Sequence, residues 1–421
     1  MERRNFIKNI ILGAGGIALA ETGFVSCMGR NKVERYFDEK TGMTYRRLGS
    51  TNLRVSEVSL GGEWLERHNE EEVAEVVKYC EEHGVNLLDV WMPNPTIRTS
   101  LGKALKGHRK KWYIQGHIGS TWQNGQYLRT RDMSLVKPAF EDLLERLQTD
   151  YIDLGMIHYV DQIKEWNEIV NGEFYQYVLE LKKQGKIRHI GMSTHNPAVA
   201  QVVAESGICE MILFSLNPAY DMLPSDVEIW DGDFSKATGG INPERAKLYQ
   251  TCESLGVGIT VMKAYAGARL FDPQLSPFGV ALTPVQCLHY ALTRPAVASV
   301  LVGCENLDQV NDMLSYETAS EAEKDYASVL AHAPAHAYGG QCTYCGHCKP
   351  CQVGVDIAMV NKLSDLAAMH PEGVPDSVKD HYKVLDMHAS DCTECGKCET
   401  RCPFGVGVME KMKKTRRMFG Y

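Results

Sequence analysis

Residues 392–403 read Cys-Thr-Glu-Cys-Gly-Lys-Cys-Glu-Thr-Arg-Cys-Pro, with four cysteines separated by two, two and three residues. Loops this short let successive sulfurs converge on one small polyhedron, which is how proteins hold an iron–sulfur cluster. A second group lies upstream, with its last spacing shortened to two, at Cys342, Cys345, Cys348 and Cys351. These cysteines predict a small α-rich iron–sulfur domain over residues 335–421.

The downstream spacing, C-x2-C-x2-C-x3-C-P, matches the bacterial two-cluster ferredoxin pattern, in which the fourth cysteine ligates the other cluster. The pattern implies two [4Fe-4S] clusters, one held by Cys342, Cys345, Cys348 and Cys402 and the other by Cys392, Cys395, Cys398 and Cys351. The upstream group departs from the pattern, because Gln352 stands where proline is usual. Zinc is the main alternative, but tetrahedral zinc needs two C-x2-C pairs and not three cysteines in each tight run.

The N-terminus begins Met-Glu-Arg-Arg-Asn-Phe-Ile-Lys and continues into an apolar run from Ile10 to Ala20. It resembles a twin-arginine export signal, R-R-x-F-[LI]-K, and the apolar run is short for a membrane span. We therefore expect a signal peptide at residues 1–29, and a periplasmic or membrane-anchored protein. The twin-arginine route carries folded proteins, which suits clusters assembled in a reducing compartment. Cys27 follows a small residue, as in a loose lipobox, and is a candidate lipid anchor.

Charge and composition exclude one class of partner. The formal net charge is −8, the pI is near 6.0, and no long basic block occurs. A nucleic-acid-binding chain would carry a basic patch. We therefore expect a small-molecule substrate and a redox partner protein, with no nucleic acid.

Between a linker at 30–44 and the cysteine-rich tail, residues 45–330 alternate short apolar runs with amphipathic segments. This alternation is typical of βα units and a parallel sheet. No G-x-G-x-x-G follows the first apolar run, which disfavours a Rossmann fold. Eight strands in this length favour a closed (β/α)8 barrel. The expected strands are Val55–Leu60, Asn86–Val90, Trp112–Gly116, Tyr151–Ile157, His189–Met192, Met211–Phe214, Val257–Met262 and Ser299–Val302.

Several stretches resemble the aldo-keto reductase family, and the cysteine-rich tail resembles the branch of that family with a C-terminal ferredoxin-type domain. The stretches include Gly84-Val-Asn-Leu-Leu-Asp89, Asp150-Tyr-Ile-Asp-Leu-Gly-Met-Ile-His158 and Gly185-Lys-Ile-Arg-His-Ile-Gly-Met-Ser193. The resemblance implies hydride transfer between NADPH and a carbonyl at the C-terminal ends of the barrel strands. It also implies a tetrad of Asp, Tyr, Lys and His, in which the tyrosine donates the proton.

Two members of the tetrad match and two do not. Asp89 takes the aspartate position and His158 the histidine position, whereas Asn94 stands at the tyrosine position and His117 at the lysine position. An amide cannot serve as a general acid, so the family's proton donor is missing. Asp89, His117 and His158 are the catalytic candidates, and His195 lies close by in the sequence pattern. Two histidines and a carboxylate suit a divalent metal or an acid–base pair.

The family's positions for contacting a nicotinamide cofactor are also only partly kept. Ser193 keeps the first residue of the family's Ser-Asn pair, and Gly303 ends the last strand without a nearby Arg or Lys for a 2′-phosphate. Lys263 follows strand seven and could bind a phosphate or an anionic substrate. Ser193, Lys263 and Gly303 are therefore the candidate cofactor residues, and NADP(H) itself is doubtful.

Three functions remain open at this point. The first is an iron–sulfur oxidoreductase that acts on a carbonyl or a sugar-like molecule, with electrons passing through both clusters. The second is a non-redox barrel enzyme that uses a metal or histidines, such as an epimerase, lyase or hydrolase. The third is an electron relay with a catalytically silent barrel. Family resemblance favours the first.

Overall fold

The computed structural model describes residues 35–230 and 232–421. The expected signal peptide and Cys27 lie outside the described residues. Within the described ranges, no helix combines the length and apolar character that a membrane crossing needs.

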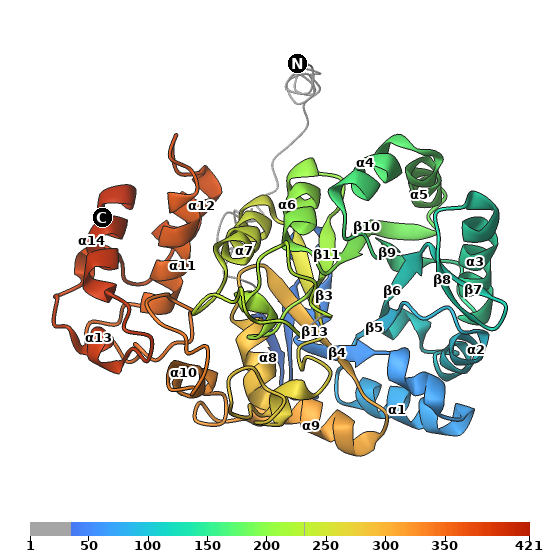
Figure 1. Ribbon diagram of the computed structural model, residues 1–421, viewed down its shortest axis with the longest axis horizontal. Coiled ribbons are helices and arrows are strands. Elements are labelled where there is room, and N and C mark those ends of the chain that lie inside the picture. The colour runs from blue at the N-terminus through green and yellow to red at the C-terminus, as the bar shows by residue number, and fades with distance from the viewer. Residues whose placement is uncertain (1–34, 231) are drawn as a thin grey trace, which may run out of the picture. The chain divides into compact units, whose positions relative to one another are not determined.

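Eight parallel strands close into a barrel whose order follows the chain, because the last strand pairs with the first (Figure 1). The expected (β/α)8 fold is confirmed, and each expected strand overlaps one barrel strand with boundaries shifted by a few residues. The first expected strand, Val55–Leu60, begins outside the barrel, whose first strand starts at Val58. The barrel strands are β4 (Val58–Gly61), β5 (Leu87–Val90), β6 (Tyr113–Ile118), β9 (Ile152–Ile157), β10 (Ile187–Thr194), β11 (Met211–Ser215), β12 (Gly258–Met262) and β13 (Val297–Gly303).

Helices surround the strands as an outer ring (Figure 1). Four of them begin with a capping side chain followed by proline, which satisfies a free backbone N–H and presets the first turn. The helices of this part of the chain are α1 (Glu70–Glu82), α2 (Pro95–Ala104), α3 (Met133–Arg146), α4 (Ile163–Asn171), α5 (Glu173–Lys183), α6 (Pro197–Ser206), α7 (Pro243–Leu255), α8 (Pro284–Leu292), α9 (Leu307–Thr318) and α10 (Tyr326–Ala331).

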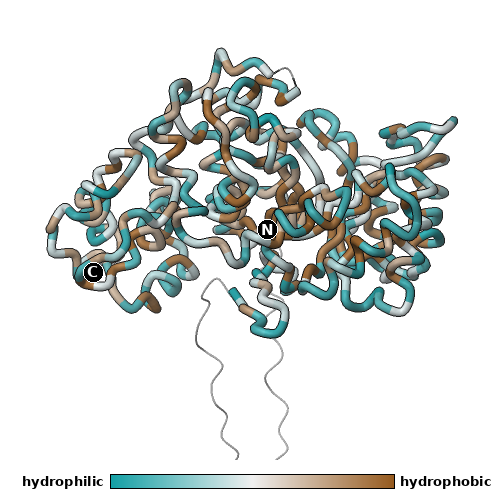
Figure 2. Tube along the Cα trace, turned by 90° about the horizontal axis from the view of Figure 1, so that it is seen from below, coloured by the Kyte–Doolittle hydropathy of each residue, from teal (hydrophilic) through white to brown (hydrophobic). Residues whose placement is uncertain are grey.

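Two apolar layers hold the barrel together. One fills its interior with residues such as Leu87, Leu154, Met156 and Leu213, and the other lies between strands and helices. Figure 2 shows hydrophobic stretches gathered inside and hydrophilic ones along the periphery. Side chains alternate between the two layers along each strand, because the strand period is two.

The N-terminal segment differs from the sequence expectation. Residues 35–44, expected as part of a linker, contribute to an antiparallel sheet of β1 (Arg35–Asp38), β2 (Met43–Arg47) and β3 (Arg54–Ser56). The buried Glu57 carboxylate binds Arg35 and Arg46, both at 2.6 Å, and so ties this sheet to the start of β4. Exposed charged and aromatic residues in a short strand gave no clear strand signal.

The C-terminal domain consists of four helices and the cysteine loops between them. The helices are α11 (Ile357–Ala368), α12 (Asp376–Lys383), α13 (Lys397–Arg401) and α14 (Val408–Phe419). The domain contacts the barrel through the Thr343 carbonyl, which accepts from the Arg294 guanidinium, and through Lys362 on α11, which pairs with Glu253 at 2.6 Å.

Candidate functional site

The mouth of the barrel gathers the three catalytic candidates because of strand periodicity. Asp89 lies two residues after the interior Leu87, and His158 lies two residues after the interior Met156. His117 lies opposite Met156 in the β6–β9 register. Inward-facing residues at the C-terminal strand ends therefore converge, and barrel enzymes keep their chemistry at that end. Asp89, His117 and His158 are 4, 2 and 5 % exposed.

The three side chains form one hydrogen-bonded chain. His117 Nε2 lies 3.1 Å from Asp89 Oδ1, and His117 Nδ1 lies 2.8 Å from His158 Nδ1. His158 Nε2 in turn lies 2.8 Å from the Tyr127 hydroxyl. Gln115 supports the inner end by donating to Asp89 Oδ1 at 2.6 Å. The chain thus runs from a buried carboxylate through two imidazoles to a phenol.

One assignment of protons satisfies this chain with both histidines neutral. His117 Nε2–H donates to the Asp89 carboxylate, and His158 Nδ1–H donates to the bare Nδ1 of His117. The Tyr127 hydroxyl then donates to the bare Nε2 of His158. Burial lowers the pKa of His158 well below its ordinary value, and the neighbouring His117, Arg131 and Arg129 lower it further. A neutral His158 agrees with this assignment.

Tyr127 was missed by the sequence analysis, because it lies outside the barrel strands. It belongs to β8 (Gln126–Arg129), which pairs with β7 (Ser120–Gln123) in a hairpin inserted after β6. The signal was present in Asn124-Gly125, which take φ of 52° and 80°. Asn-Gly with positive φ at both positions is the preferred two-residue hairpin turn. Burial raises the pKa of the Tyr127 hydroxyl to about 12.

Asn94 has a structural role. Its side-chain oxygen accepts from the Thr96 backbone N–H at 2.9 Å and caps α2. Its amide nitrogen lies 3.4 Å from Glu66 Oε2.

The hydrogen-bonded chain also bears on the divalent-metal alternative. All four ring nitrogens of His117 and His158 already face Asp89, Tyr127 or each other. The geometry therefore favours proton transfer over metal coordination.

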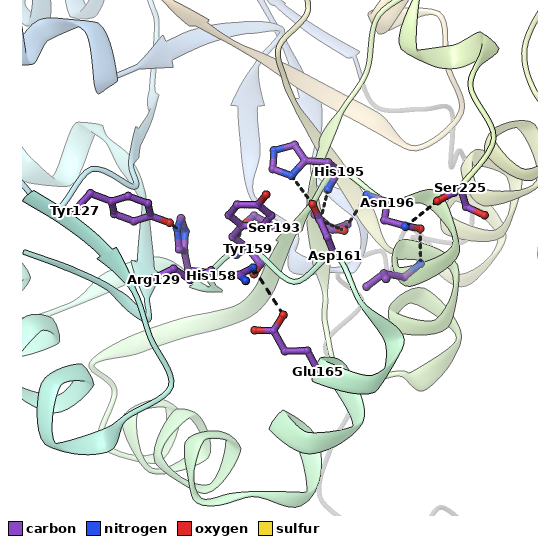
Figure 3. A network of polar contacts seen from close by, with 12 residues as sticks. Tyr127, Arg129, His158, Tyr159, Asp161, Glu165, Ser193, His195, Asn196 and Ser225 are labelled. Atoms are coloured by element: carbon purple, nitrogen blue, oxygen red, sulfur yellow. Dashed lines mark hydrogen bonds and ion pairs between the residues drawn. The ribbon is translucent and has the colours of Figure 1, made fainter. Parts of the chain in front are cut away.

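A second histidine–carboxylate pair faces the other side of the mouth (Figure 3). His195 Nδ1 lies 2.9 Å from Asp161 Oδ2, and Asp161 Oδ1 accepts the His195 backbone N–H at 2.7 Å. Burial raises the pKa of Asp161, but the hydrogen bond and charge of His195 lower it overall. The His195 ring packs edge-on against Trp230, with 4.9 Å between ring centroids.

Two of the three candidate cofactor residues are engaged by other groups. Ser193 Oγ accepts the Tyr159 backbone N–H at 2.8 Å. A Cβ placed on Gly303 would overlap the Trp64 indole, so the indole covers the end of β13. The next acidic side chain, Glu305, pairs with Arg67 at 3.1 Å near the start of α9. Lys263 remains at the mouth, with its ammonium 4.5 Å from the Trp230 ring centroid.

The eight cluster cysteines line two cavities, in the grouping that the spacing predicted. We call the cavity lined by Cys342, Cys345, Cys348 and Cys402 the inner cavity. We call the cavity lined by Cys351, Cys392, Cys395 and Cys398 the outer cavity. Their remaining walls are largely apolar, and Val408 lines both.

The chemistry of these sulfurs suits a cationic cluster. Burial and the charges of Cys342 and Cys345 raise the pKa of the Cys348 thiol to about 12. Four thiolates held this close together repel one another, and bound metal ions offset that repulsion. The Asn361 amide donates to Cys342 Sγ at 3.4 Å, as hydrogen bonds to cluster sulfurs do. The cysteines other than Cys27 and the cluster set, Cys80, Cys209, Cys252, Cys287 and Cys304, are buried and free.

Comparisons with known proteins agree with this architecture. The model of the aldo/keto reductase family matches residues 57–278, and that of the 4Fe-4S dicluster domain matches residues 338–406. The uncharacterized oxidoreductase YqkF of Bacillus subtilis is 27% identical over 317 residues, covering 70% of this chain and 98% of that protein. Protein tas of Escherichia coli is 25% identical over 316 residues, covering 64% of this chain and 91% of its own. The holo form of aldo-keto reductase AKR11C1 from Bacillus halodurans has a similar fold, with a TM-score of 0.54 at 23% identity, covering 67% of this chain and 94% of its own.

Proposed function

Because this chain belongs to the aldo/keto reductase family and carries a 4Fe-4S dicluster domain, we propose that it interconverts a carbonyl and an alcohol on a small, sugar-like molecule at the barrel mouth. It is an oxidoreductase with iron–sulfur clusters. The observation that carries the proposal is the hydrogen-bonded chain from Asp89 through His117 and His158 to Tyr127.

Tyr127 supplies a phenolic hydroxyl, the type of group that the family's tyrosine uses as proton donor and that Asn94 lacks. In the oxidising direction, the phenol passes its proton to His158 Nε2 as it takes the proton of the substrate hydroxyl. His158 Nδ1–H moves to His117 Nδ1, and His117 Nε2–H moves to Asp89. The buried carboxylate stores one proton, and the reverse sequence delivers a proton to a substrate oxygen during reduction. Positioned acid–base groups of this kind contribute ~10²–10⁴-fold to rate.

The two cysteine sets Cys342, Cys345, Cys348, Cys402 and Cys351, Cys392, Cys395, Cys398 are the proposed ligands of the two clusters. Each bound cluster supplies exchange of one electron, so two clusters match the two electrons of an alcohol–carbonyl change. Oxidation of the alcohol also releases two protons, one through Tyr127 and the other to water. A redox partner protein is the proposed source or sink of the electrons.

The residues expected to hold a nicotinamide nucleotide fit that group poorly. Trp64 lies against Gly303, and the Glu305 carboxylate near the N-terminus of α9 pairs with Arg67, so that this cation is already engaged and is not free for a phosphate. We therefore derive no step through NADP(H).

A second candidate function rests on the Asp161–His195 pair. Two separate acid–base groups at one mouth suit a non-redox proton exchange, such as that of an epimerase or lyase. In that case turnover would proceed without change in the oxidation state of the clusters.

The expected signal peptide at residues 1–29 is the basis of a proposal about location. We propose that the protein acts in the periplasm or anchored to a membrane, with Cys27 as the candidate lipid site. Its substrate would then be a small molecule of that compartment.

The experiment is an anaerobic survey of simple sugars and their keto forms, with a one-electron dye as electron acceptor or donor. With a substrate in hand, Tyr127→Phe and His158→Gln should each reduce kcat at least ~100-fold. Tyr159 lies at the mouth but is not part of the hydrogen-bonded chain, so Tyr159→Phe should reduce kcat less than about tenfold. Full activity of Tyr127→Phe would refute the proposed proton path, and turnover without dye reduction or oxidation would favour the second candidate.

A further inference from the structure

The two cluster cavities have different surroundings. The outer cavity is lined by Cys395, which is exposed, and by Lys397 on the surface helix α13. The inner cavity is lined by Thr343, whose carbonyl and hydroxyl accept from the buried Tyr326 hydroxyl on the barrel side. The outer cavity therefore opens toward solvent, whereas the inner one adjoins the barrel.

A buried cation stands behind the inner cavity. Arg294, 3% exposed, donates through Nη2 to the Thr343 carbonyl, to Tyr326 at 3.1 Å and to Thr293 at 2.8 Å. Its Nε and Nη1 are buried and have no hydrogen-bond partner in the described part of the chain. A guanidinium stays charged at every accessible pH. Its charge is therefore weakly screened by solvent and only partly satisfied by neighbouring groups.

The buried charges on the barrel side of Arg294 do not cancel it. The buried Asp221 carboxylate lies 3.7 Å from Arg245 and accepts from the Tyr290 hydroxyl at 2.8 Å. The Arg294 guanidinium lies 4.5 Å from the Tyr290 ring centroid. One carboxylate against two guanidiniums leaves this buried network with a net positive charge. A positive charge in a low-dielectric interior stabilises added negative charge nearby.

We propose that Arg294 raises the reduction potential of the cluster in the inner cavity above that of the cluster in the outer cavity, so that electrons entering from a partner protein come to rest beside the barrel. The inference rests on the proposed loading of both clusters. Reduction adds one electron to an already anionic cluster–thiolate unit, and net charge, hydrogen bonds to sulfur and solvent exposure set its potential. The buried charge of Arg294 and the hydrogen bond to Cys342 Sγ favour reduction at the inner cavity. They act against the solvent exposure of the outer cavity and against Lys397 and Arg401, the two cations that line it, whose charges solvent screens.

Because the inner cavity adjoins the barrel, a higher reduction potential there would hold electrons near the substrate side. Phe404, which lines the inner cavity, packs against Tyr338 with 6.1 Å between ring centroids. The Tyr338 hydroxyl donates to the Pro218 carbonyl at 2.6 Å, and the preceding Asn217 donates to the Lys263 carbonyl at the mouth at 2.9 Å. Ring packing and hydrogen bonds thus connect the inner cavity, from Phe404 through Tyr338 and the Asn217-Pro218 segment, to Lys263 at the mouth.

The test is an anaerobic redox titration of the full chain at pH 8, followed by electron paramagnetic resonance, with iron content measured first. Arg294→Gln should lower the higher of the two potentials by at least 59 mV, a tenfold change in a one-electron equilibrium, and leave the lower one in place. Arg294→Lys, which keeps the charge, and Tyr326→Phe, which removes only a hydrogen bond, should each shift it by less than half as much. Asp221→Asn removes the counter-charge and should shift the same potential upward.

Each outcome either supports or overturns the inference. If Arg294→Gln does not assemble both clusters, the inference is tested by Asp221→Asn, which should shift the higher reduction potential upward. No shift, equal shifts of both potentials, or a shift of the lower potential overturns the inference. An Arg294→Lys shift as large as that of Arg294→Gln would also overturn it, because geometry and not charge would then be responsible. No substrate enters the titration, so its result is independent of the proposed proton path.

Discussion

His117 Nδ1 and His158 Nδ1 lie 2.8 Å apart, and both rings are buried. Only one proton fits between the two nitrogens, so the rings must hold opposite roles in this hydrogen bond. The direction of that proton is tied to the Asp89 end and to the Tyr127 end, because each ring presents its other nitrogen to one of them. A change of protonation at Asp89, at either histidine or at Tyr127 therefore changes the hydrogen bonds of the other groups.

Stability should fall with acid because His158 is held neutral. Burial lowers its pKa well below the ordinary value of about 6.5, so below pH 6.5 the unfolded chain binds a proton that the folded chain does not. The free energy of unfolding then decreases as pH falls, by up to about 1.4 kcal/mol per pH unit for one such group. Denaturant unfolding between pH 5 and 8 should show a flatter slope for His158→Gln.

His289 provides the matched control. It is a second buried histidine, on α8, whose pKa burial lowers to about 3. His289→Gln should flatten the pH slope by a similar amount and leave turnover near wild type. An unchanged slope in His158→Gln would mean that His158 is protonated in the folded protein.

Asn94 should matter for stability and little for chemistry. Asn94→Ala removes the cap of α2 and should cost about 0.5–2 kcal/mol in the free energy of unfolding. Asn196→Ala removes the equivalent cap of α6 and should cost about the same. Thermal unfolding and kcat of both variants test this, and a loss of activity at Asn94 at least ~100-fold would place it in the catalytic chain.

The barrel was predictable because its strands are buried on both faces and stand out as apolar runs between helices that begin with a cap and proline. The convergence of Asp89, His117 and His158 followed from their places at strand ends. The cysteine grouping followed from the two-cluster ferredoxin pattern, in which the fourth cysteine of each run crosses to the other cluster.

The features that were missed depend on local geometry or tertiary contacts. The stretch from Trp166 to Gln184 is divided between α4 and α5 rather than forming one helix, because the chain breaks at Gly172, where a Cβ would lie 2.8 Å from the Glu168 carbonyl oxygen. Arg294 and Tyr127 gained their roles from contacts across 49 and 31 positions of sequence. No periodicity in a single chain encodes such contacts.

Export should depend on Arg3 and Arg4, which lie outside the described residues. Arg3→Lys with Arg4→Lys should leave the protein in the cytoplasm with both clusters intact, because a receptor reads the signal and the fold does not use it. Fractionation with iron analysis of each fraction tests this. Unchanged periplasmic or membrane fractions would contradict the twin-arginine interpretation.

Iron content should follow the cysteine cavities. Wild-type protein purified without oxygen should carry about eight irons per chain. Cys395→Ala, at the outer cavity, should halve this number and destabilise the C-terminal domain, whereas Cys80→Ala, in a buried apolar site, should leave it unchanged. Stoichiometric zinc with little iron would contradict the cluster assignment.

Binding of a nicotinamide nucleotide should be limited by Trp64 and Glu305. The indole covers Gly303, and the Glu305 carboxylate near the start of α9 occupies Arg67, the cation that a phosphate would otherwise meet. Trp64→Ala combined with Glu305→Gln removes both obstacles and should tighten NADPH binding at least tenfold, about 1.4 kcal/mol. Equilibrium dialysis of both proteins measures this, with Glu71→Gln as a control for the loss of one surface charge on α1. Tight NADPH binding by the wild type, unchanged in the double variant, would show that the cofactor reaches the mouth by another route and would return hydride transfer to the mechanism.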